Sequence, residues 1–390
     1  MRLGIDALHL TSAPHSGVHI ATRGIITSLA ARACSDDSFV IYVPRKAMIE
    51  LPKLPFIKYI SPFFPIRFRP FRTLWQQFFL PKRLVRDNIE VLNSPCYMTP
   101  FNSPIPSVVH VHDILALTHP KFCKLLNRVH YKLLLPIVFR TAASIVVPTA
   151  FVKDSILDWA YHNIKESVSS SSLSSRIQVI PWGVDTRFRV FSAKDKREAR
   201  ERLNLPESYV LLVSRLEPKK NFSLAIRAFF AAVHSRNLPH KLLIAGPCGF
   251  GVDHILRQEV HSLNLSDRVE WRGFVSDVDL PYYYACADLF LFPSFAEGFG
   301  IPVLESMRSG TPVIGSDIGT LREVCGDAAC LVSVNHLSGW RECIENFLLD
   351  ENVRTEYISR GICRSMEYSW DVFGVRLWET ISSVKRRLMI

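Results

Sequence analysis

Short apolar runs of strand length recur through the whole chain, and longer segments with helical patterns separate them. Strands that are apolar on both faces need cover on both faces, as in parallel sheets whose strands are joined by crossover helices. The sequence therefore predicts an α/β protein with two doubly wound, Rossmann-like domains. The expected strands are Leu3–Asp6, Phe39–Val43, Glu90–Asn93, Ser107–Val111, Ser144–Val147 and Gln178–Ile180 in the first half, and Val210–Ser214, Lys241–Ala245, Val269–Trp271, Leu289–Phe292, Pro312–Gly315 and Ala329–Val332 in the second.

The length of 390 residues is too great for one ordinary core, so two domains are the default. We predict a first domain over residues 1–188, a second over 189–370 and a final helix over 371–390 that packs back toward the first. The hinge is expected within Gly183–Leu205, and the serine-rich segment Ser167–Ser175 is expected to be a flexible surface loop. Open α/β sheets bind ligands at the carboxyl ends of their strands, so we expect the two domains to face each other across a cleft that holds the active site.

The positive charge of the chain lies in its first half. Residues 1–190 hold 23 Lys and Arg against 11 Asp and Glu, a net charge of +12, and the rest hold 24 against 25, a net charge of −1. The excess is densest in Lys46–Arg86 and Lys121–Arg140, where aromatic residues and leucines stand between the cations. This mixture suits an anionic membrane surface, which we favour over an ordinary solvated face. We expect no nucleic-acid partner, because no RNP, zinc-finger or helix-turn-helix pattern accompanies the charge.

The chain lacks the sequence signals of export and of membrane insertion. No apolar run approaches the roughly 18–20 residues of a membrane-spanning helix, and Met1–Asp6 runs straight into a strand pattern without the apolar region of a signal peptide. Nine cysteines are scattered without C-x-x-C spacing, and their odd number argues against a disulfide framework. We therefore expect a cytoplasmic protein with peripheral attachment to the inner face of the cytoplasmic membrane.

The segment Ser294–Glu305 combines two carboxylates with a glycine-rich bend. It follows the apolar run Leu289–Phe292, and Pro302 suits the first turn of a helix that begins at the bend. A strand, a glycine-rich loop and a helix in succession point free backbone amides at a ligand and favour an anion. Glu297 then lies in the loop and Glu305 on the helix, so we expect separate roles rather than a paired acid and base.

Basic residues follow the expected strand Val210–Ser214 directly. Arg215 could grip phosphate oxygens bidentately, and Lys220 could add a point charge at the start of the next helix. Taken alone, the segment favours a solvated basic turn. Its position relative to the Glu297 loop favours the phosphate interpretation instead.

Two glycines stand at other junctions between strand and loop. Gly246 follows Lys241–Ala245, and Gly17 follows the first strand and a polar loop; each would let the backbone come close to a ligand. The spacing of Gly246, Gly249 and Gly251 is not that of a dinucleotide-binding fingerprint. A plain structural turn explains each glycine equally well.

Two further groups could bind metal or substrate. The alternation of a strand puts His110 and His112 on one face, and we favour His112 as a histidine that hydrogen-bonds substrate, with a satisfied structural histidine as the alternative. A metal pair is disfavoured, because no third ligand follows at suitable spacing. Asp277-Val278-Asp279 has the D-x-D form of some metal sites, but we interpret it as a helix cap, and we expect no metal site and no cofactor.

These elements together resemble the retaining glycosyltransferases of family 4, which have the GT-B fold. The most specific match is the E-x7-E motif of that family with its flanks, from Phe292 through Ile314. Supporting matches extend the resemblance over about residues 1–380: Gly4–Ala7, Ser94-Pro95, His112-Asp113, Ile180–Asp185, Ser214–Leu216 with Lys220-Asn221, Arg272–Val275 and Ser369-Trp370.

The resemblance implies a role for each matched residue. Arg215 and Lys220 would neutralise the donor diphosphate as it leaves, and Glu297 would contact hydroxyls of the transferred sugar. His112 would face that sugar from the first domain. The remaining donor contacts are a ribose contact by Glu305, diphosphate contacts by the Gly17 loop, a nucleotide contact at Gly246, backbone contacts at Phe299, Gly300 and Ile301, and positions near the base for Gly273, Phe274 and Val275.

The resemblance also implies a reaction. The acceptor hydroxyl would attack from the front side, without an assigned covalent nucleophile or a required metal. Gly4–Ala7 and His112-Asp113 resemble mannosyltransferases of surface polysaccharide assembly, so the expected donor is GDP-mannose and the expected acceptor a lipid-linked or glycan hydroxyl. Two positions depart from the family: His19 replaces a small residue after the loop glycine, and Trp182 replaces an asparagine near the hinge.

Two alternatives belong to other functional classes. A nucleotide-sugar epimerase of the same fold would turn over its donor without an acceptor. A nucleic-acid-binding protein that used the basic first half would bind oligonucleotides with steep salt dependence and have no affinity for the donor.

Overall fold

The computed structural model describes residues 1–390 except 11–15, 64–65, 67, 165–169, 250 and 388–390. It forms two compact units, of which unit 1 comprises Met1–Gly183 with Ser369–Ile390, and unit 2 comprises Val184–Tyr368. The divisions thus lie at 183/184 and 368/369, where 188/189 and 370/371 were expected. The backbone N–H of Val184 donates to the carbonyl of Tyr368 at 3.1 Å, which ties the two ends of unit 2 together.

Unit 1 contains a seven-stranded parallel sheet with the order β3-β2-β1-β4-β5-β6-β7. Its strands are β1 (Arg2–Asp6), β2 (Ser38–Tyr42), β3 (Ile57–Ile60), β4 (Val91–Ser94), β5 (Ser107–His110), β6 (Ser144–Val147) and β7 (Ile177–Val179). Six of these were expected from the sequence. The edge strand β3 was missed, because its residues are mostly half-buried and it lacks the continuous apolar run of a central strand.

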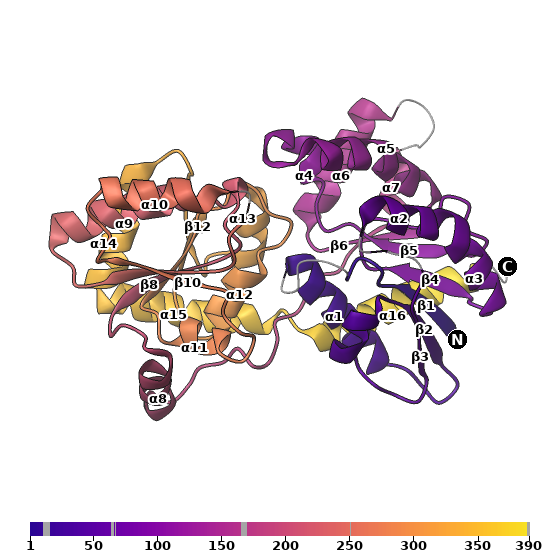
Figure 1. Ribbon diagram of the computed structural model, residues 1–390, viewed down its shortest axis with the longest axis horizontal. Coiled ribbons are helices and arrows are strands. Elements are labelled where there is room, and N and C mark those ends of the chain that lie inside the picture. The colour runs from indigo at the N-terminus through magenta and orange to yellow at the C-terminus, as the bar shows by residue number, and fades with distance from the viewer. Residues whose placement is uncertain (11–15, 64–65, 67, 165–169, 250, 388–390) are drawn as a thin grey trace. The chain divides into compact units, whose positions relative to one another are not determined.

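Helices cover both faces of this sheet (Figure 1). They are α1 (Gly17–Ala30), α2 (Arg69–Leu74), α3 (Leu80–Arg86), α4 (Leu115–Thr118), α5 (Leu125–Thr141), α6 (Ala150–Asn163), α7 (Ser170–Arg176) and α16 (Trp370–Arg386), with the short turns η1 (Arg45–Glu50), η2 (Trp75–Phe79) and η3 (Pro120–Phe122). One core cluster joins β5, β6 and β7 to α5 and α6 through Val109, Ile145, Phe139 and Ile156.

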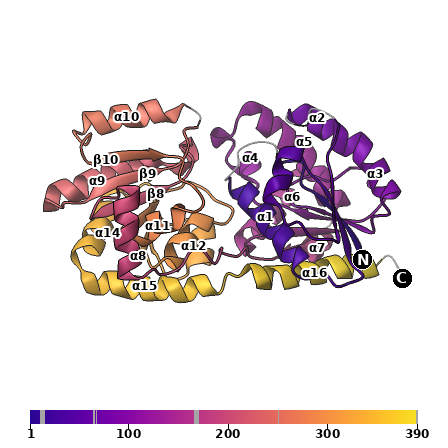
Figure 2. The same cartoon turned by 60° about the horizontal axis from the view of Figure 1, so that its bottom comes forward.

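The last helix of the chain, α16, belongs to unit 1 and packs against α1. Figure 2 shows it lying along α1 in the C-terminal colour. Phe373, Leu377 and Ile381 are buried on its inner side, and the ring of Trp370 occupies the space that a side chain at Gly24 would need. The first domain is therefore built from both ends of the sequence.

Unit 2 contains a six-stranded parallel sheet with the order β10-β9-β8-β11-β12-β13. Its strands are β8 (Tyr209–Val213), β9 (Lys241–Ala245), β10 (Val269–Gly273), β11 (Leu289–Phe292), β12 (Val313–Ser316) and β13 (Cys330–Val332). All six were expected, within two residues at either end. The fully apolar β11 is central and buried along its whole length, as its composition predicts.

The helices of unit 2 also lie on both faces of its sheet (Figure 1). They are α8 (Ala193–Leu203), α9 (Phe222–Arg236), α10 (Val252–Ser262), α11 (Leu280–Ala285), α12 (Ile301–Arg308), α13 (Gly319–Cys325), α14 (Leu337–Leu349) and α15 (Glu351–Met366), with the turn η4 (Pro218–Lys220). One core cluster packs alternate residues of β8 and β11 against α9, α10 and α14, including Leu212, Leu291, Phe229 and Trp340. Two Rossmann-like units are thus confirmed.

The prediction of a flexible loop over Ser167–Ser175 is wrong for the part that the structure describes. Ser170–Arg176 forms α7, whereas residues 167–169 lie outside the described part. Leu173 is buried in the core of unit 1, and the guanidinium of Arg176 donates to the carbonyls of Ala142 at 2.6 Å and Phe139 at 2.7 Å. Tertiary contacts thus hold a helix that its serine-rich composition does not favour.

Across the described residues, none of the helices combines the length and the apolar character needed to cross a membrane.

Candidate functional site

The strand order of unit 2 reverses between β8 and β11, which are neighbours in the sheet although two strands separate them in sequence. At such a switch point the loops diverge to opposite faces and leave a crevice at the carboxyl ends of the strands. The β8 loop carries Arg215 and Lys220, and the β11 loop carries Glu297. The topology thus brings together three residues that the sequence analysis selected separately.

Lys220 and Glu297 form a buried ion pair at this switch point. The Lys220 Nζ atom lies 2.5 Å from the Glu297 Oε1 atom, and the two side chains are only 14% and 10% exposed. Burial lowers the pKa of Lys220. Burial would raise the pKa of Glu297, but the charges of Lys220 and Lys219 outweigh that effect and hold the pKa below its usual value. The carboxylate is therefore ionised at neutral pH and pairs with the ammonium group.

Backbone contacts hold this ion pair in place. The turn η4 ends at Lys220, and the carbonyl of Lys219 accepts a hydrogen bond from the N–H of Phe295 at 2.9 Å, which links the β8 loop to the β11 loop. The Thr320 hydroxyl donates to the Glu297 carbonyl at 2.7 Å. The ammonium group of Lys220 also lies 5.1 Å from the ring centre of Phe292. The charges are thus fixed in advance of a ligand, which avoids reorganisation when charge develops.

Arg215 is a second cation in the β8 loop. Its side chain is half-buried, and its stem lies against the position where a Cβ at Gly249 would stand. Within the described part of the chain, the structure gives its guanidinium group no hydrogen bond and no acidic partner. A half-buried cation without an acid beside it favours an anionic ligand, and a guanidinium group suits phosphate oxygens.

The helix α12 begins at the end of the β11 loop. Gly300 is its N-cap residue with φ of +100°, a conformation that glycine adopts without strain, and Pro302 lies in the first turn as predicted. The flanking Phe299 and Ile301 are almost fully buried, which fixes the backbone on either side of the cap. The first amides of a helix have no acceptor within it, so this end of α12 favours an anion.

Glu305 lies on α12 and is buried. Its carboxylate accepts a hydrogen bond from the hydroxyl of Tyr284 at 3.0 Å, and only 4% of the residue is exposed. Burial raises the pKa of Glu305 to about 7, although the Tyr284 hydroxyl and the charge of Arg187 act in the opposite direction. A buried carboxylate has lost its hydrogen bonds to water, so each hydroxyl that donates to it stabilises its ionised form.

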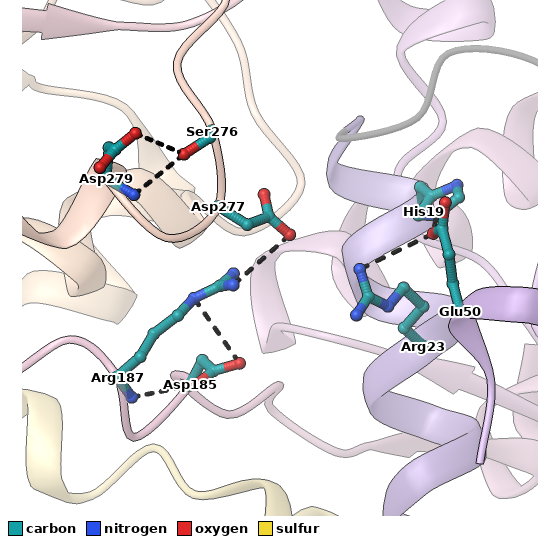
Figure 3. Close-up of polar contacts among 8 residues, drawn as sticks. All are labelled: His19, Arg23, Glu50, Asp185, Arg187, Ser276, Asp277 and Asp279. Carbon is teal, nitrogen blue, oxygen red and sulfur yellow. Dashed lines mark hydrogen bonds and ion pairs between the residues drawn. The ribbon is translucent and has the colours of Figure 1, made fainter. Parts of the chain in front are cut away.

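Three charged residues around Glu305 were not predicted to act on it. Asp185, Arg187 and Asp277 all influence its pKa, and Arg187 pairs with Asp277 at 3.4 Å and with Asp185 at 3.8 Å. Figure 3 shows Arg187 between the two aspartates. Asp185 ends the matched Ile180–Asp185 segment, which was a usable signal. Tyr284 gave none, since an aromatic residue in an apolar helix is typical of core packing.

The D-x-D segment is engaged in ion pairs and in a contact with Ser276. Asp277 pairs with Arg187, and Asp279 pairs with Arg202 at 2.7 Å. The Ser276 hydroxyl donates to the Asp279 carboxylate at 2.7 Å and accepts from the Asp279 N–H at 3.1 Å, as Figure 3 shows. Asp279 is also the N-cap residue of α11. The Asp279 side chain makes no capping hydrogen bond to α11, so both carboxylates of the segment are engaged in ion pairs and the Ser276 contact instead.

Two glycines of unit 2 lie at the ends of β9 and β10, on the side of β8 that is away from β11: Gly246 follows β9, and Gly273 is the last residue of β10. Gly246 follows β9 with φ of +142°, and a Cβ there would stand 1.9 Å from the carbonyl oxygen of Ser214. Its N–H donates to the Gly273 carbonyl at 2.6 Å. A side chain at position 246 would thus clash with the backbone of Ser214, and the nucleotide contact stays a prediction. Gly273 itself is exposed, and Phe274 and Val275 follow it with exposed and half-buried side chains, respectively.

The predicted residues of unit 1 lie near the carboxyl edge of its own sheet. His112 follows β5 and is buried, and its ring packs at 5.2 Å from the ring centre of Tyr97 and 4.9 Å from that of Trp182. Burial lowers the pKa of His112 to about 4, against a smaller effect of the Pro95 backbone, so the ring is neutral at pH 7. Trp182, which departs from the family pattern, thus contacts a predicted catalytic residue directly.

Gly17 is the first residue of α1, directly after the N-cap Ser16 and the residues 11–15 that lie outside the described part. A Cβ at Gly17 would meet no atom within 4 Å. His19 is buried on α1, and its Nε2 atom lies 3.1 Å from the carboxylate of Glu50, which also pairs with Arg23 at 3.8 Å (Figure 3). The His19 ring, at the position that departs from the family pattern, thus forms a polar contact with Glu50 at the end of η1. The roles of His112 and Gly17 stay predictions.

Residues 193–363 match the family described as "Glycosyl transferases group 1". The O-antigen chain mannosyltransferase B of Escherichia coli is 33% identical over 165 residues, which cover 42% of this chain and 43% of that protein. The serotype-specific mannosyltransferase WbdA of Escherichia coli is 31% identical over 201 residues, which cover 50% of this chain and 24% of that protein. The chain thus matches less than half the length of these relatives.

Solved structures match the chain over its whole length at lower identity. Anabaena Alr3699/HepE in complex with UDP and glucose has a TM-score of 0.74 at 20% identity and covers 98% of this chain and 100% of that one. WaaG, a glycosyltransferase involved in lipopolysaccharide biosynthesis, has a TM-score of 0.73 at 16% identity and covers 98% and 99%. Residues 193–363 are thus similar to the group 1 glycosyltransferases, and the chain as a whole has the GT-B fold of these solved structures.

Proposed function

We propose that this protein transfers a hexose from a nucleotide-sugar donor to a hydroxyl of a lipid-linked or glycan acceptor, with retention of the anomeric configuration, in the biosynthesis of a surface polysaccharide. The observation that carries the proposal is the Lys220–Glu297 ion pair at the switch point of unit 2, with Arg215 in the same loop as Lys220. The cations would bind the donor diphosphate, and the carboxylates would bind hydroxyls.

The charges suit the departure of a nucleoside diphosphate. As the bond between sugar and phosphate breaks, negative charge grows on the diphosphate and positive charge grows on the sugar carbon. Arg215 and Lys220 would stabilise the leaving diphosphate, together with the amides at Phe299, Gly300 and Ile301 that begin α12. The Gly17 loop would assist from unit 1. We propose that these residues do this without a metal or another cofactor.

The two carboxylates of the E-x7-E segment would act separately. Glu297 is ionised and paired with Lys220, so it would accept hydrogen bonds from hydroxyls of the transferred sugar. Glu305 would accept hydrogen bonds from the ribose hydroxyls, which would offset the cost of ionising a buried carboxyl group. Gly273, Phe274 and Val275 would lie by the base, and a neutral His112 would contact the sugar. The acceptor hydroxyl would attack from the front side.

Mannose from GDP-mannose is the donor that we propose first. Relatives that match 42% and 50% of the chain are named as an O-antigen chain mannosyltransferase and a serotype-specific mannosyltransferase. A D-inositol 3-phosphate glycosyltransferase of Acidothermus cellulolyticus matches at 32% identity over 206 residues, so the matched region does not by itself select the acceptor. We place the protein at the cytoplasmic face of the membrane, where a lipid-linked acceptor would be available.

A panel of GDP-, UDP-, ADP- and dTDP-sugars tests this function by thermal shift and isothermal titration. We expect GDP-mannose to give the largest shift, and Lys220→Ala to reduce it. The anomeric configuration of the product, read by NMR, tests retention. Isomerisation of the donor without an acceptor would favour the epimerase alternative. Tight, salt-dependent binding of oligonucleotides without donor affinity would favour the nucleic-acid alternative.

A further inference from the structure

One face of α5 in unit 1 is apolar and exposed. We define the α5 face by six exposed residues of this helix: Leu125, Leu126, Val129, Lys132, Leu133 and Arg140. The exposed fractions of its apolar members are 70% for Leu125, 83% for Leu126, 50% for Val129 and 64% for Leu133. At about 100° per residue these six positions fall within one side of the helix.

The core of unit 1 fixes this orientation. Leu135, Val138 and Phe139 lie on the other side of α5 and are buried against β5, β6 and α6. The helix therefore cannot turn its exposed leucines inward without withdrawing these three residues from the core. Contiguous exposed apolar side chains of this kind mark a surface that docks on something else.

The charged residues of α5 and of the segments that flank it in sequence are all basic. Lys121, Lys124, Arg128, Lys132 and Arg140 are basic, and the sequence from Ile114 to Lys153 contains no Asp or Glu. A second copy of the chain, docked symmetrically, would bring these cations together. Nucleic-acid phosphates would pair with the cations but would leave the exposed leucines uncovered. An anionic lipid surface matches both the leucines and the cations.

A second apolar stripe lies on the neighbouring helical segment. The α2–η2 stripe consists of Phe68, Phe71, Leu74 and Phe78, which are 60%, 41%, 44% and 64% exposed. Arg69 connects this segment to α5, because its guanidinium donates to the side-chain oxygen of Asn127 and lies 5.0 Å from the ring centre of Tyr131. Figures 1 and 2 both show α2 beside α5.

We propose that the α5 face, together with the α2–η2 stripe, is a membrane-docking surface that lies on an anionic bilayer. Leucine and phenylalanine side chains enter the boundary between headgroups and acyl chains, and the lysines and arginines contact lipid phosphates. The proposal rests on the proposed function only in that a lipid-linked acceptor would reside in such a bilayer. Docking would hold unit 1 at the surface where that acceptor is presented.

Co-sedimentation of the full chain with vesicles tests the docking surface. We expect binding to phosphatidylcholine vesicles that contain phosphatidylglycerol, weaker binding to phosphatidylcholine alone, and a decline as salt increases. The triple variant Leu125→Ser/Leu126→Ser/Leu133→Ser should lose binding. The double variant Lys132→Glu/Arg140→Glu should weaken binding to the anionic vesicles by at least about 10-fold, since each nearby cation contributes about a factor of five.

Two substitutions in unit 2 serve as matched controls. Ile255→Ser removes an apolar residue that is 63% exposed, and Lys194→Glu reverses an exposed cation of α8; both should bind vesicles like the wild type. Circular dichroism and donor affinity should be unchanged in every variant, so a failed donor assay tests the proposed function and not the docking surface. Equal binding to neutral and anionic vesicles would overturn the proposal. So would wild-type binding by the α5 variants, or a dimer that these variants dissociate.

Discussion

The two units share one strand order over six strands, to which unit 1 adds β7 at its edge, but they carry different chemistry at their switch points. In unit 2, the loops after β8 and β11 hold the charged pair of Lys220 and Glu297. In unit 1, Asp6 at the end of β1 is buried with its pKa raised to about 6, and accepts a hydrogen bond from the Gln76 amide at 2.7 Å. The β4 residue Asn93 contacts His110 at 2.9 Å.

This difference shows what the fold decides and what the loops decide. Parallel strands with a reversal of order place side chains at a crevice in both sheets. The side chains at the crevice then select the ligand, because fixed charges favour an anion whereas neutral hydrogen-bonding groups favour hydroxyls. The charges of unit 2 are accordingly suited to an anion such as a diphosphate, whereas Asp6, Asn93 and His110 of unit 1 are buried and hydrogen-bond within the protein.

The largest expected effect is the loss of the cation at the unit 2 switch point. Lys220→Ala should lower kcat by about 10²–10³-fold, since it removes a charge that stabilises the leaving group. It also leaves the buried Glu297 without its partner, which destabilises a protein by about 3–5 kcal/mol, so the assay belongs at a temperature where circular dichroism shows a folded chain. Steady-state kinetics with a saturating donor measures the effect.

Lys241→Ala is the matched control for this substitution. Lys241 forms an exposed ion pair with Glu270 at 2.7 Å in the same sheet, and such pairs contribute at most about 1 kcal/mol. Activity should be unchanged. Equal losses in the two variants would mean that the switch point of unit 2 has no special role in turnover.

The next effect tests whether the two units can be perturbed separately. Phe373 on α16 is 1% exposed in the core of unit 1, and Phe373→Ala should destabilise that unit by about 3–5 kcal/mol. Donor affinity, which we assign to unit 2, should be retained while unit 1 stays folded. Denaturant unfolding and calorimetric titration measure the two quantities. Val372→Ala, at a residue that is 48% exposed, is the control and should change neither. A large loss of donor affinity in the folded Phe373→Ala protein would contradict the separation.

The sequence predicted the sheets better than the site. Near-continuous apolar runs identified every strand except β3, because burial on both faces leaves a signal in composition. The contacts made by loop residues left a weaker signal in the sequence. Arg215, Lys220 and Glu297 could be selected because each follows an apolar strand, but the contact between Lys220 and Glu297 depends on which strands are neighbours. Tyr284 and Arg187 act on Glu305 from distant segments, so local sequence patterns do not mark them.

A smaller effect concerns Glu305 and is pH-dependent. Its pKa rises from about 4.5 to about 7 on folding, so the folded state binds the proton more tightly. The stability that this provides is fully present below about pH 4.5 and is lost as the pH rises through about 7. Glu305→Gln cannot ionise and should be more stable than the wild type at pH 8, by at most about 3 kcal/mol, and similar at pH 4.5. Thermal unfolding at the two pH values measures this.

The same variant distinguishes stability from binding. If the carboxylate accepts hydrogen bonds from the ribose, the wild type should bind donor more tightly as the pH rises through about 7, and Glu305→Gln should bind weakly at every pH. A variant that gains stability and keeps donor affinity would show that Glu305 is a core residue without a role in the site.

The smallest effect concerns the D-x-D segment of unit 2. We expect its acidic residues to contribute to stability and not to donor binding at the switch point. The Asp279 carboxylate pairs with Arg202 and accepts a hydrogen bond from the Ser276 hydroxyl, so Asp279→Ala should cost about 1 kcal/mol of stability. Transfer activity should survive this substitution, and the wild-type activity should survive chelation by EDTA, because Arg215 and Lys220 would supply the positive charge that a metal supplies elsewhere. The opposite result would be activity that EDTA abolishes, that Mn²⁺ restores and that Asp279→Ala loses. It would show that the D-x-D segment binds a metal, and that Arg215 and Lys220 alone do not neutralise the diphosphate.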